Sequence, residues 1–198
     1  MAHTDEISTI LLEDSHGTKE VSIKSYNTSK RKLFLFGEID SASLYTFAGQ
    51  LMVLISENPK EKIELYINSP GGSISDGLAI CDLISQHKDI IDIYCMGIAY
   101  SMGSIILSCG KEGHRFIYPH SKVMIHEPLI TGLSRTSATS LKDAADSILK
   151  SKDVIIDLLV KNTKKSKEEI EEAISFDNYM SAEEAIEFHI ADKIVDVE

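Results

Sequence analysis

Ser101 lies in the short segment AYSMG, residues 99–103, between an apolar run that precedes it and another that follows it. The segment matches the nucleophile elbow G-x-S-x-G, with Ala99 in place of the first glycine. At a sharp turn from strand to helix, a serine presents its hydroxyl outward, and the first N–H groups of the helix have no intrahelical partner. We therefore predict that Ser101 is a nucleophile.

A serine nucleophile needs a general base and an acid that orients the base. His126 ends the run KVMIH and precedes Glu127, but six other histidines compete for the role, and a buried structural histidine is the commoner case. Asp177 lies in a connection between two predicted helices, where a solvated loop or capping aspartate is the commoner case. The residues alone therefore leave both assignments open.

Two backbone amides are candidates for binding the oxyanion. Gly72 follows a predicted strand and has no side chain to prevent its N–H from facing a substrate, although a tight turn would also explain the pair Gly71-Gly72. Met102 offers an N–H at the start of a predicted helix. Together they would form an oxyanion hole.

The elements that must position these groups alternate between strands and helices. We expect strands at residues 31–36, 62–68, 114–118 and 122–126 and before Ser101, and helices at residues 44–56, 74–86 and directly after Ser101. This order predicts an α/β domain with a largely parallel sheet. Since ligands gather at the carboxyl ends of parallel strands, Gly71-Gly72 and Ser101 should lie on the same edge.

Local signals mark several helix starts. Ser43 is expected to cap the helix at residues 44–56, and Ser73 the helix that begins at Ile74. Capping boxes begin two later helices: Ser166 with Glu169, and Ser181 with Glu184. A long amphipathic helix at residues 141–161 is expected to extend beyond the globule. Residues 1–24 are predicted to form a hairpin or arm, and residues 25–198 a single domain.

Composition excludes several classes of function. The 31 acidic and 20 basic residues give a net charge of −11, which opposes binding to nucleic acid or an anionic membrane. No window is apolar for long enough to span a bilayer, and the start of the chain has no secretory pattern, so we expect a cytosolic protein. No phosphate loop or zinc-ligand spacing is present, and no cofactor or metal is expected.

With these residues identified, most of the chain, from residue 34 to residue 195, resembles the proteolytic subunits of the ATP-dependent Clp proteases. The resemblance rests on four motifs: LYINSPGG, CMGIAYSMGS, SKVMIHEP and DNYMSAEEAIEF. It implies Ser101 as nucleophile, His126 as general base and then acid, and Asp177 as the orienting acid. It also implies that Gly72 and Met102 form the oxyanion hole and that the substrate contacts are Gly71, Ile74 and Leu129.

The resemblance further implies a fold and an assembly. The fold is a crotonase-like stack of ββα units with a protruding handle helix, here residues 141–161. Seven subunits would form a ring, and two rings would meet through the handles to enclose the sites. A hexameric ATPase would thread unfolded proteins through an axial pore lined by the arm, with docking pockets near Tyr66, Phe116 and Tyr118.

The chain departs from the family pattern at several positions. Ser175 and Phe176 replace the acid and arginine that usually link the two rings. Glu127 replaces a glutamine, residues 129–135 keep one glycine, and His189 stands where a glycine with positive φ is usual. These departures indicate a divergent member or a second paralogue.

Three functions remain open from the sequence. The leading hypothesis is a serine endopeptidase that holds its substrate as an added strand between Ile74 and a strand at residues 129–131. The second is a non-catalytic or conditionally active subunit of a mixed ring, suggested by Ser175 and Phe176. The third is a crotonase-like acyl-thioester enzyme, which shares the fold and a two-amide oxyanion hole.

Overall fold

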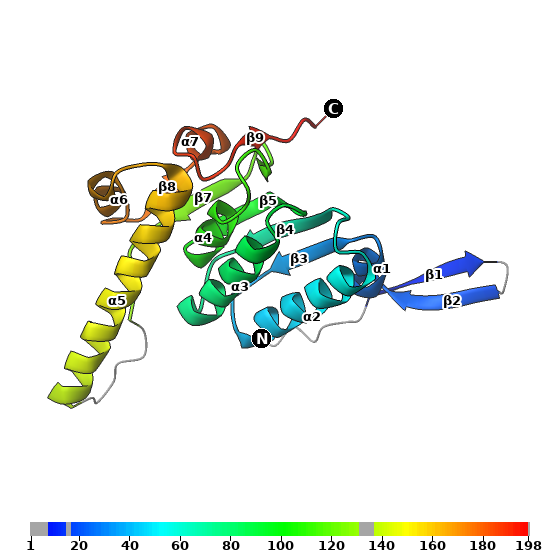
Figure 1. The fold of residues 1–198 in the computed structure, drawn as a ribbon, viewed down its shortest axis with the longest axis horizontal. Helices are drawn as coiled ribbons and strands as arrows, with labels where there is room; N and C mark the ends of the chain where they lie inside the picture. Colours follow the sequence, from blue (N-terminus) through cyan, green and yellow to red (C-terminus); the bar gives the residue numbers. More distant parts are fainter. Residues whose placement is uncertain (1–7, 15–16, 131–136, 198) are drawn as a thin grey trace.

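A mostly parallel sheet with helices along one face forms the centre of the molecule in the computed structural model (Figure 1). The structure describes residues 8–14, 17–130 and 137–197. Five strands follow one another in parallel across the sheet: β3 (Lys32–Phe36), β4 (Ile63–Ser69), β5 (Ile91–Tyr100), β6 (Arg115–Ile117) and β9 (Lys193–Ile194). β7 (Lys122–Ile125) pairs in parallel with the end of β5, and β8 (Asn178–Met180) pairs antiparallel with β7. The predicted α/β fold with a largely parallel sheet is confirmed.

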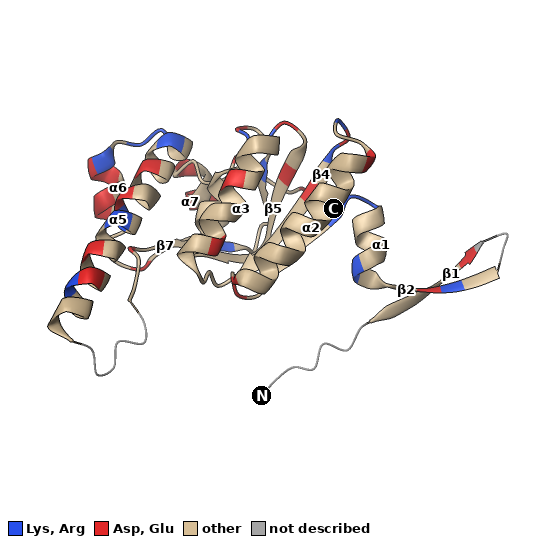
Figure 2. Ribbon diagram, turned by 60° about the horizontal axis from the view of Figure 1, so that its bottom comes forward, with Lys and Arg blue, Asp and Glu red and all other residues tan. Residues whose placement is uncertain are grey.

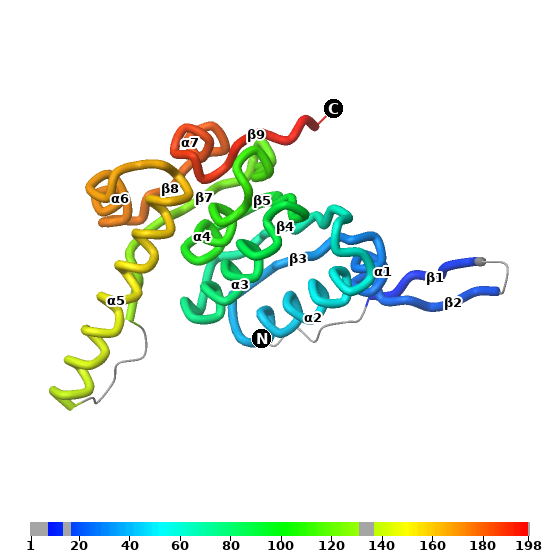
Figure 3. The backbone as a smooth tube through the Cα atoms, viewed as in Figure 1, coloured from blue at the N-terminus to red at the C-terminus, as the bar shows by residue number. Residues whose placement is uncertain are grey.

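Three helices cover one face of the sheet: α2 (Ser41–Glu57), α3 (Ile74–His87) and α4 (Met102–Ser108) (Figure 1). The long helix α5 (Ala138–Thr163) protrudes at one end, followed by α6 (Lys167–Ala173) and α7 (Ala182–Glu187). At the other end, the hairpin of β1 (Thr9–Asp14) and β2 (Gly17–Ser22) extends away from the core beyond α1 (Ile23–Ser29), as the path of the chain in Figure 3 shows. No helix in the described ranges is both long and apolar enough to cross a bilayer.

The strand residues alternate between the two faces of the sheet. In β4, Ile63, Leu65 and Ile67 are buried under the helices, and the intervening Tyr66 is half-buried on the opposite face. There the aromatic rings of neighbouring strands stack in a row, with centroids 4.8–5.2 Å apart, that comprises Phe34, Tyr66, Tyr94 and Phe116. The row contains Tyr66 and Phe116, two of the three residues near which docking pockets are expected from the resemblance.

The helix α2 differs from the other long helix in its charge. Glu57 is its only charged residue, whereas acidic and basic residues are spread along α5 and α6 (Figure 2). Several large apolar side chains of α2 are also exposed to solvent, namely Tyr45, Met52 and Val53. A helix face of this kind is typical of a surface that another protein covers.

The helix starts agree with most of the capping predictions. Ser73, Ser166 and Ser181 each accept a hydrogen bond from the backbone N–H three residues later, and the last two form full capping boxes. The prediction for α2 was wrong. Asp40 is its N-cap and accepts from Ser43 N at 2.8 Å, while the Ser43 hydroxyl interacts with the Asp40 backbone. The helix therefore begins at Ser41, because a carboxylate three residues upstream captures the N–H of the predicted cap.

Other differences concern short elements and the ends of helices. The long helix is longer than predicted and runs over Ala138–Thr163, since Ser137 caps it with its side chain. The helix α1 and the two- and three-residue strands β9 and β8 were not predicted. Leu129 and Ile130 belong to no strand, contrary to the expected substrate-binding strand at residues 129–131, and Thr131 and the altered glycine-rich segment after it lie outside the described residues.

A buried ion pair fixes the end of the chain to the sheet. The Arg115 guanidinium contacts Asp192 at 2.6 and 2.9 Å, and the same carboxylate accepts backbone N–H bonds from Gly113 and Arg115. Arg115 also donates to the carbonyls of Ser108 and Asn162. One side chain therefore joins β6 to α4, to α5 and to the segment that leads into β9.

Candidate active site

Ser101 occupies a strained turn between β5 and α4. Its backbone has φ 52° and ψ −123°, which few non-glycine residues adopt. The turn is fixed by two hydrogen bonds: Ser101 N donates to Met124 O at 2.8 Å, and the Ser104 hydroxyl donates to Ser101 O at 2.6 Å. The strain is thus held by the surrounding sheet and helix, as expected for a serine whose hydroxyl is displayed to a cleft.

The pairing of β7 with β8 places the histidine and the aspartate side by side. Ile125 pairs with Asn178 in the antiparallel register, so the residue that follows β7, His126, lies beside the residue that precedes β8, Asp177. A further bond from Glu127 N to Ile174 O, at 2.8 Å, ties the same two segments together. Residues that lie 51 positions apart in the chain therefore meet through a three-residue strand.

The three predicted side chains form a continuous hydrogen-bonded series. Ser101 Oγ lies 2.9 Å from His126 Nε2, and His126 Nδ1 lies 3.2 Å from Asp177 Oδ1. The histidine side chain is 15% exposed and the aspartate side chain 62% exposed. Water therefore screens the charge of Asp177 in the isolated chain, and its electrostatic effect on the imidazole is weaker than that of a buried carboxylate.

Gly71 and Gly72 form the wall of the cleft opposite the elbow. A Cβ on Gly71 would lie 2.6 Å from Ser101 Cβ, and one on Gly72 would lie 2.2 Å from Ile39 O. Both residues also have positive φ, at 99° and 149°. Only glycine allows the chain to pass this close to the serine.

The backbone of Ile39 holds this wall in a defined orientation. Ile39 N donates to Gly71 O at 2.8 Å, and Ser73 N donates to Ile39 O at 2.7 Å. Since successive N–H groups of an extended chain point to opposite sides, the Gly72 N–H is directed away from Ile39. Within the described ranges, neither Gly72 N nor Met102 N donates to a backbone carbonyl. Both amides are thus available to an oxyanion.

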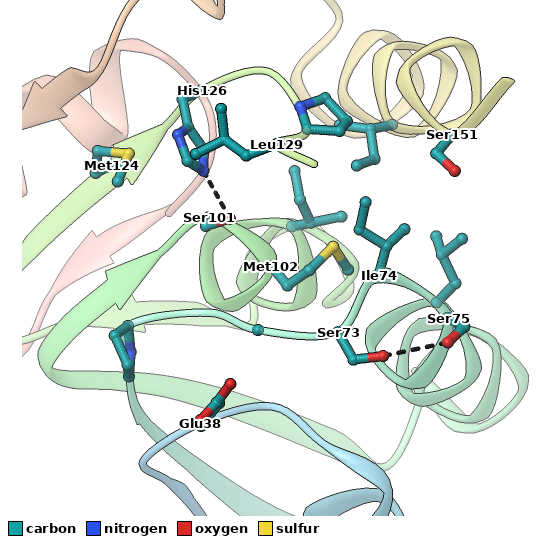
Figure 4. Close-up of a pocket in the computed structure, with 16 residues that line it drawn as sticks. Glu38, Ser73, Ile74, Ser75, Ser101, Met102, Met124, His126, Leu129 and Ser151 are labelled. Carbon is teal, nitrogen blue, oxygen red and sulfur yellow. Dashed lines mark hydrogen bonds between the residues drawn. The ribbon is translucent and has the colours of Figure 1, made fainter. Parts of the chain in front are cut away.

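A cleft of about 760 Å³ opens beside Ser101, between α3, α4 and α5 (Figure 4). The predicted residues Ser101, His126, Gly72, Ile74 and Leu129 all line it, and Met102 does as well. Asp177 lies behind His126, and Gly71 packs against the elbow. The structure therefore brings every predicted site residue to one place.

Sequence reasoning missed part of the lining. One side of the cleft is apolar and includes residues that no sequence signal assigned to the site, namely Leu78, Ile105, Met124, Pro128 and Ile155. Ile155 belongs to the predicted amphipathic helix at residues 141–161, and amphipathic spacing indicates a helix face but not a site. Glu38 also lines the cleft, and no motif contains it.

The residue after the histidine is tied to the long helix. Glu127 Oε2 lies 2.6 Å from Lys152 Nζ of α5, with the two side chains 46% and 31% exposed. The departure from glutamine at this position therefore creates an ion pair next to the candidate base. His189, another departure, has φ 64°, so the expectation of a left-handed conformation there is confirmed.

The remaining departures lie on the surface near Asp177. Phe176 is 58% exposed, and the Ser175 hydroxyl donates to Glu172 O, near the end of α6. Within the described residues, neither Ser175 nor Phe176 forms a hydrogen bond with the candidate triad. Among residues 8–14, 17–130 and 137–197, no group of three or more His, Cys, Asp or Glu side chains is placed to hold a metal ion.

The chemistry of this arrangement is that of nucleophilic acyl transfer. The imidazole can accept the Ser101 proton as the oxygen attacks a carbonyl, and two amides face the position where negative charge would develop. The comparison with protein families agrees with this geometry. The model of the family described as Clp protease matches residues 15–198. Because the match covers nearly the whole chain, this protein belongs to the Clp protease family.

Proposed function

We propose that this chain is a serine endopeptidase that hydrolyses peptide bonds of unfolded proteins and peptides. The observation that carries the proposal is the hydrogen-bonded series from Ser101 to His126 to Asp177 at the edge of an open cleft. In this mechanism Ser101 attacks the scissile carbonyl, and His126 takes its proton and then gives it to the leaving amine. The N–H groups of Gly72 and Met102 stabilise the tetrahedral oxyanion.

The substrate would bind in an extended conformation along residues 71–74. The free edge of this segment offers backbone groups for an added strand, and Leu129 bounds the cleft from the other side. The side chain before the scissile bond would enter the apolar part of the cleft, beside Ile74 and Ile155. Binding of this kind depends mainly on the peptide backbone, which suits a protease that acts on many sequences.

Membership of the Clp protease family supports an assembly in rings that works with a hexameric ATPase. We propose rings of seven subunits that stack in pairs, with the hairpin at the axial pore and α5 as the handle. Exposed apolar residues on three surfaces support such contacts: Met52 on α2, Leu149 on α5 and Leu11 on the hairpin. The open aromatic row around Tyr66 would be the ATPase docking surface.

The experiment that tests the proposal is cleavage of fluorogenic peptides and of an unfolded protein by purified wild type and by Ser101→Ala. We expect the variant to lose at least about a thousandfold in kcat. Ser56→Ala, which removes the same hydroxyl from an exposed site on α2, is the matched control and should cleave like the wild type. Equal cleavage by wild type and Ser101→Ala would refute the proposal.

A second candidate function is a conditionally active or non-catalytic subunit of a mixed ring. The observation that favours it is the 62% exposure of the Asp177 side chain. The two residues before Asp177 are Ser175 and Phe176, which replace the residues that usually link the rings. If an isolated ring cleaves short peptides by itself, this alternative is wrong. If cleavage appears only when an active paralogue is added and survives Ser101→Ala, the alternative is favoured.

A further inference from the structure

Glu38 is held at the wall of the cleft by the backbone on both sides of it. Gly37 N donates to Asn68 O at 2.9 Å, and the neighbouring Ile39 is bonded to Gly71 and Ser73. The stem of the glutamate packs closely against the glycine wall, since a Cβ on Gly72 would lie 3.0 Å from Glu38 Cγ. The backbone and the Cγ of Glu38 are therefore held against the glycine wall, and its carboxylate lies at the edge of the cleft.

Glu38 has no evident structural role in its own segment. The start of α2 is already capped by Asp40, which accepts from Ser43 N. Glu38 is exposed, and its side chain forms no hydrogen bond or ion pair with the described residues. A solvated loop carboxylate is the simplest alternative, but it does not explain why the side chain lines the cleft.

The charge of Glu38 stands out among its surroundings. The other residues that line the cleft are apolar side chains, serines, Gly72 and His126, and none is an aspartate, lysine or arginine. A single carboxylate in a partly enclosed cleft that has no other acidic residue and no lysine or arginine in its lining attracts a cationic group more strongly than the same carboxylate on an open surface.

Figure 4 shows where this charge lies relative to Ser101. Ile74, Ser75 and Ser151 lie to the right of the serine in this view, and Glu38 lies below it, at a different part of the cleft lining. If the substrate side chain before the scissile bond occupies the apolar side of the cleft, beside Ile74, the part of the substrate after the bond extends toward Glu38. The carboxylate is then within reach of the first or second residue of the leaving peptide.

We propose that Glu38 is a specificity-determining residue that favours substrates with lysine or arginine at the first or second position after the scissile bond. This inference rests on the proposed peptidase function and adds a substrate class to it. The lysine or arginine side chain would form an ion pair with the carboxylate while the acyl half fills the apolar side of the cleft.

The effect is expected to be modest because the pair would be partly exposed. We expect kcat/KM for a peptide with lysine to exceed that for the matched glutamine peptide by about threefold to fivefold. High salt should reduce this ratio, since it screens exposed charges. Glutamate at the same position should lower the rate.

The test compares matched peptides with lysine, glutamine or glutamate at the first and at the second position after the bond. The quantity measured is the ratio of kcat/KM values within each protein, for wild type, Glu38→Gln and Glu38→Lys. We expect the lysine preference to vanish in Glu38→Gln and to change to a glutamate preference in Glu38→Lys. Glu57→Gln, which removes one charge from the far end of α2, should keep the wild-type ratio.

A binding measurement separates this inference from the proposed function. Fluorescence anisotropy of labelled lysine and glutamine peptides would be recorded with Ser101→Ala and with Ser101→Ala/Glu38→Gln, so no turnover is needed. Cleavage of neutral peptides without any lysine preference overturns the role of Glu38 and leaves the peptidase intact. If no peptide is cleaved but lysine peptides bind more tightly in a way that depends on Glu38, the proposed peptidase function is overturned and the role of Glu38 in binding is retained. Equal binding of both peptides also overturns the role of Glu38.

Discussion

Replacing Asp192 with asparagine removes the countercharge of an arginine that is almost fully buried. The Arg115 side chain is 3% exposed and that of Asp192 13% exposed, and two bonds of 2.6 and 2.9 Å join them. The same carboxylate accepts two backbone N–H bonds, from Gly113 and Arg115. In Asp192→Asn, Arg115 remains fixed by the carbonyls of Ser108 and Asn162 and cannot turn toward water.

The cost follows from leaving this charge without a partner. Removing one member of a buried ion pair destabilises a protein by about 3–5 kcal/mol. The asparagine oxygen can still accept one or two of the original hydrogen bonds, which recovers part of the loss. We therefore expect the free energy of unfolding to fall by about 3 kcal/mol.

The assay is urea unfolding followed by circular dichroism, at one fixed protein concentration because assembly adds to stability. The control is Glu112→Gln, which removes an equally close partner from Lys164 in a pair whose side chains are 69% and 64% exposed. Its unfolding midpoint should barely move. A loss below about 1 kcal/mol in Asp192→Asn would refute the reasoning, since it would not exceed the loss caused by an average point mutation.

The same carboxylate gives a dependence on pH. Burial alone would raise the pKa of Asp192, but the Arg115 guanidinium and the backbone N–H groups outweigh it and hold the pKa below its ordinary value. Its stabilisation is therefore complete above the ordinary aspartate pKa of about 4 and is lost as the pH falls through the lower pKa of the folded state. The stability difference between wild type and Asp192→Asn should narrow in that acid range. A difference that stayed constant or widened would contradict this assignment.

Three further changes test other parts of the structure. His189→Gly should raise the free energy of unfolding by up to about 1 kcal/mol in urea titrations, because glycine adopts the observed φ of 64° without strain, and a fall would contradict this. Gly72→Ala should lower peptide kcat/KM by at least about a hundredfold. The added Cβ would lie 2.2 Å from Ile39 O and would displace the backbone N–H that binds the oxyanion. Unchanged cleavage would exclude Gly72 as an oxyanion donor. A double-mutant cycle of Glu127→Gln and Lys152→Met should give a coupling of about 0.2–1 kcal/mol that disappears in high salt, and additive effects would show that the pair contributes nothing.

The parts of the fold that the sequence predicted well have strong local signals. The elbow at Ser101 combines small residues with apolar runs on both sides, and the boxes at Ser166 and Ser181 each satisfy two backbone donors within one turn. The long helix has a clear apolar stripe. These elements depend on residues only a few positions apart.

The elements that were missed depend on contacts between distant residues. The strands β8 and β9 have three and two residues, too few for a period, and exist because β7 and β6 offer edges for pairing. In α1, the sequence IKSYNTS has no apolar stripe. At the start of α2, both Asp40 and Ser43 are residue types that cap helices. The Asp40 side chain accepts from the Ser43 backbone N–H, and the Ser43 side chain accepts from the Asp40 backbone N–H. A sequence pattern that assigns one capping residue does not predict this reciprocal pair.

The choice of catalytic histidine and aspartate shows the same limit. Motif spacing could not distinguish Asp177 from other loop aspartates, and the register of Ile125 with Asn178 is what brings it to His126. Only the resemblance to a family predicted the assignment. No motif of that family contains Glu38, and its position beside Gly72 depends on a single isolated bridge between Ile39 and Gly72.

The central claim is that Ser101 is an activated nucleophile in this chain. The most direct test is reaction with a fluorophosphonate probe, read by intact mass, for wild type, Ser101→Ala and His126→Ala. The account predicts one adduct per wild-type chain, none on Ser101→Ala, and greatly slowed labelling of His126→Ala, because the imidazole 2.9 Å from the hydroxyl activates it. An unlabelled wild type, or equal labelling of Ser101→Ala, would contradict it.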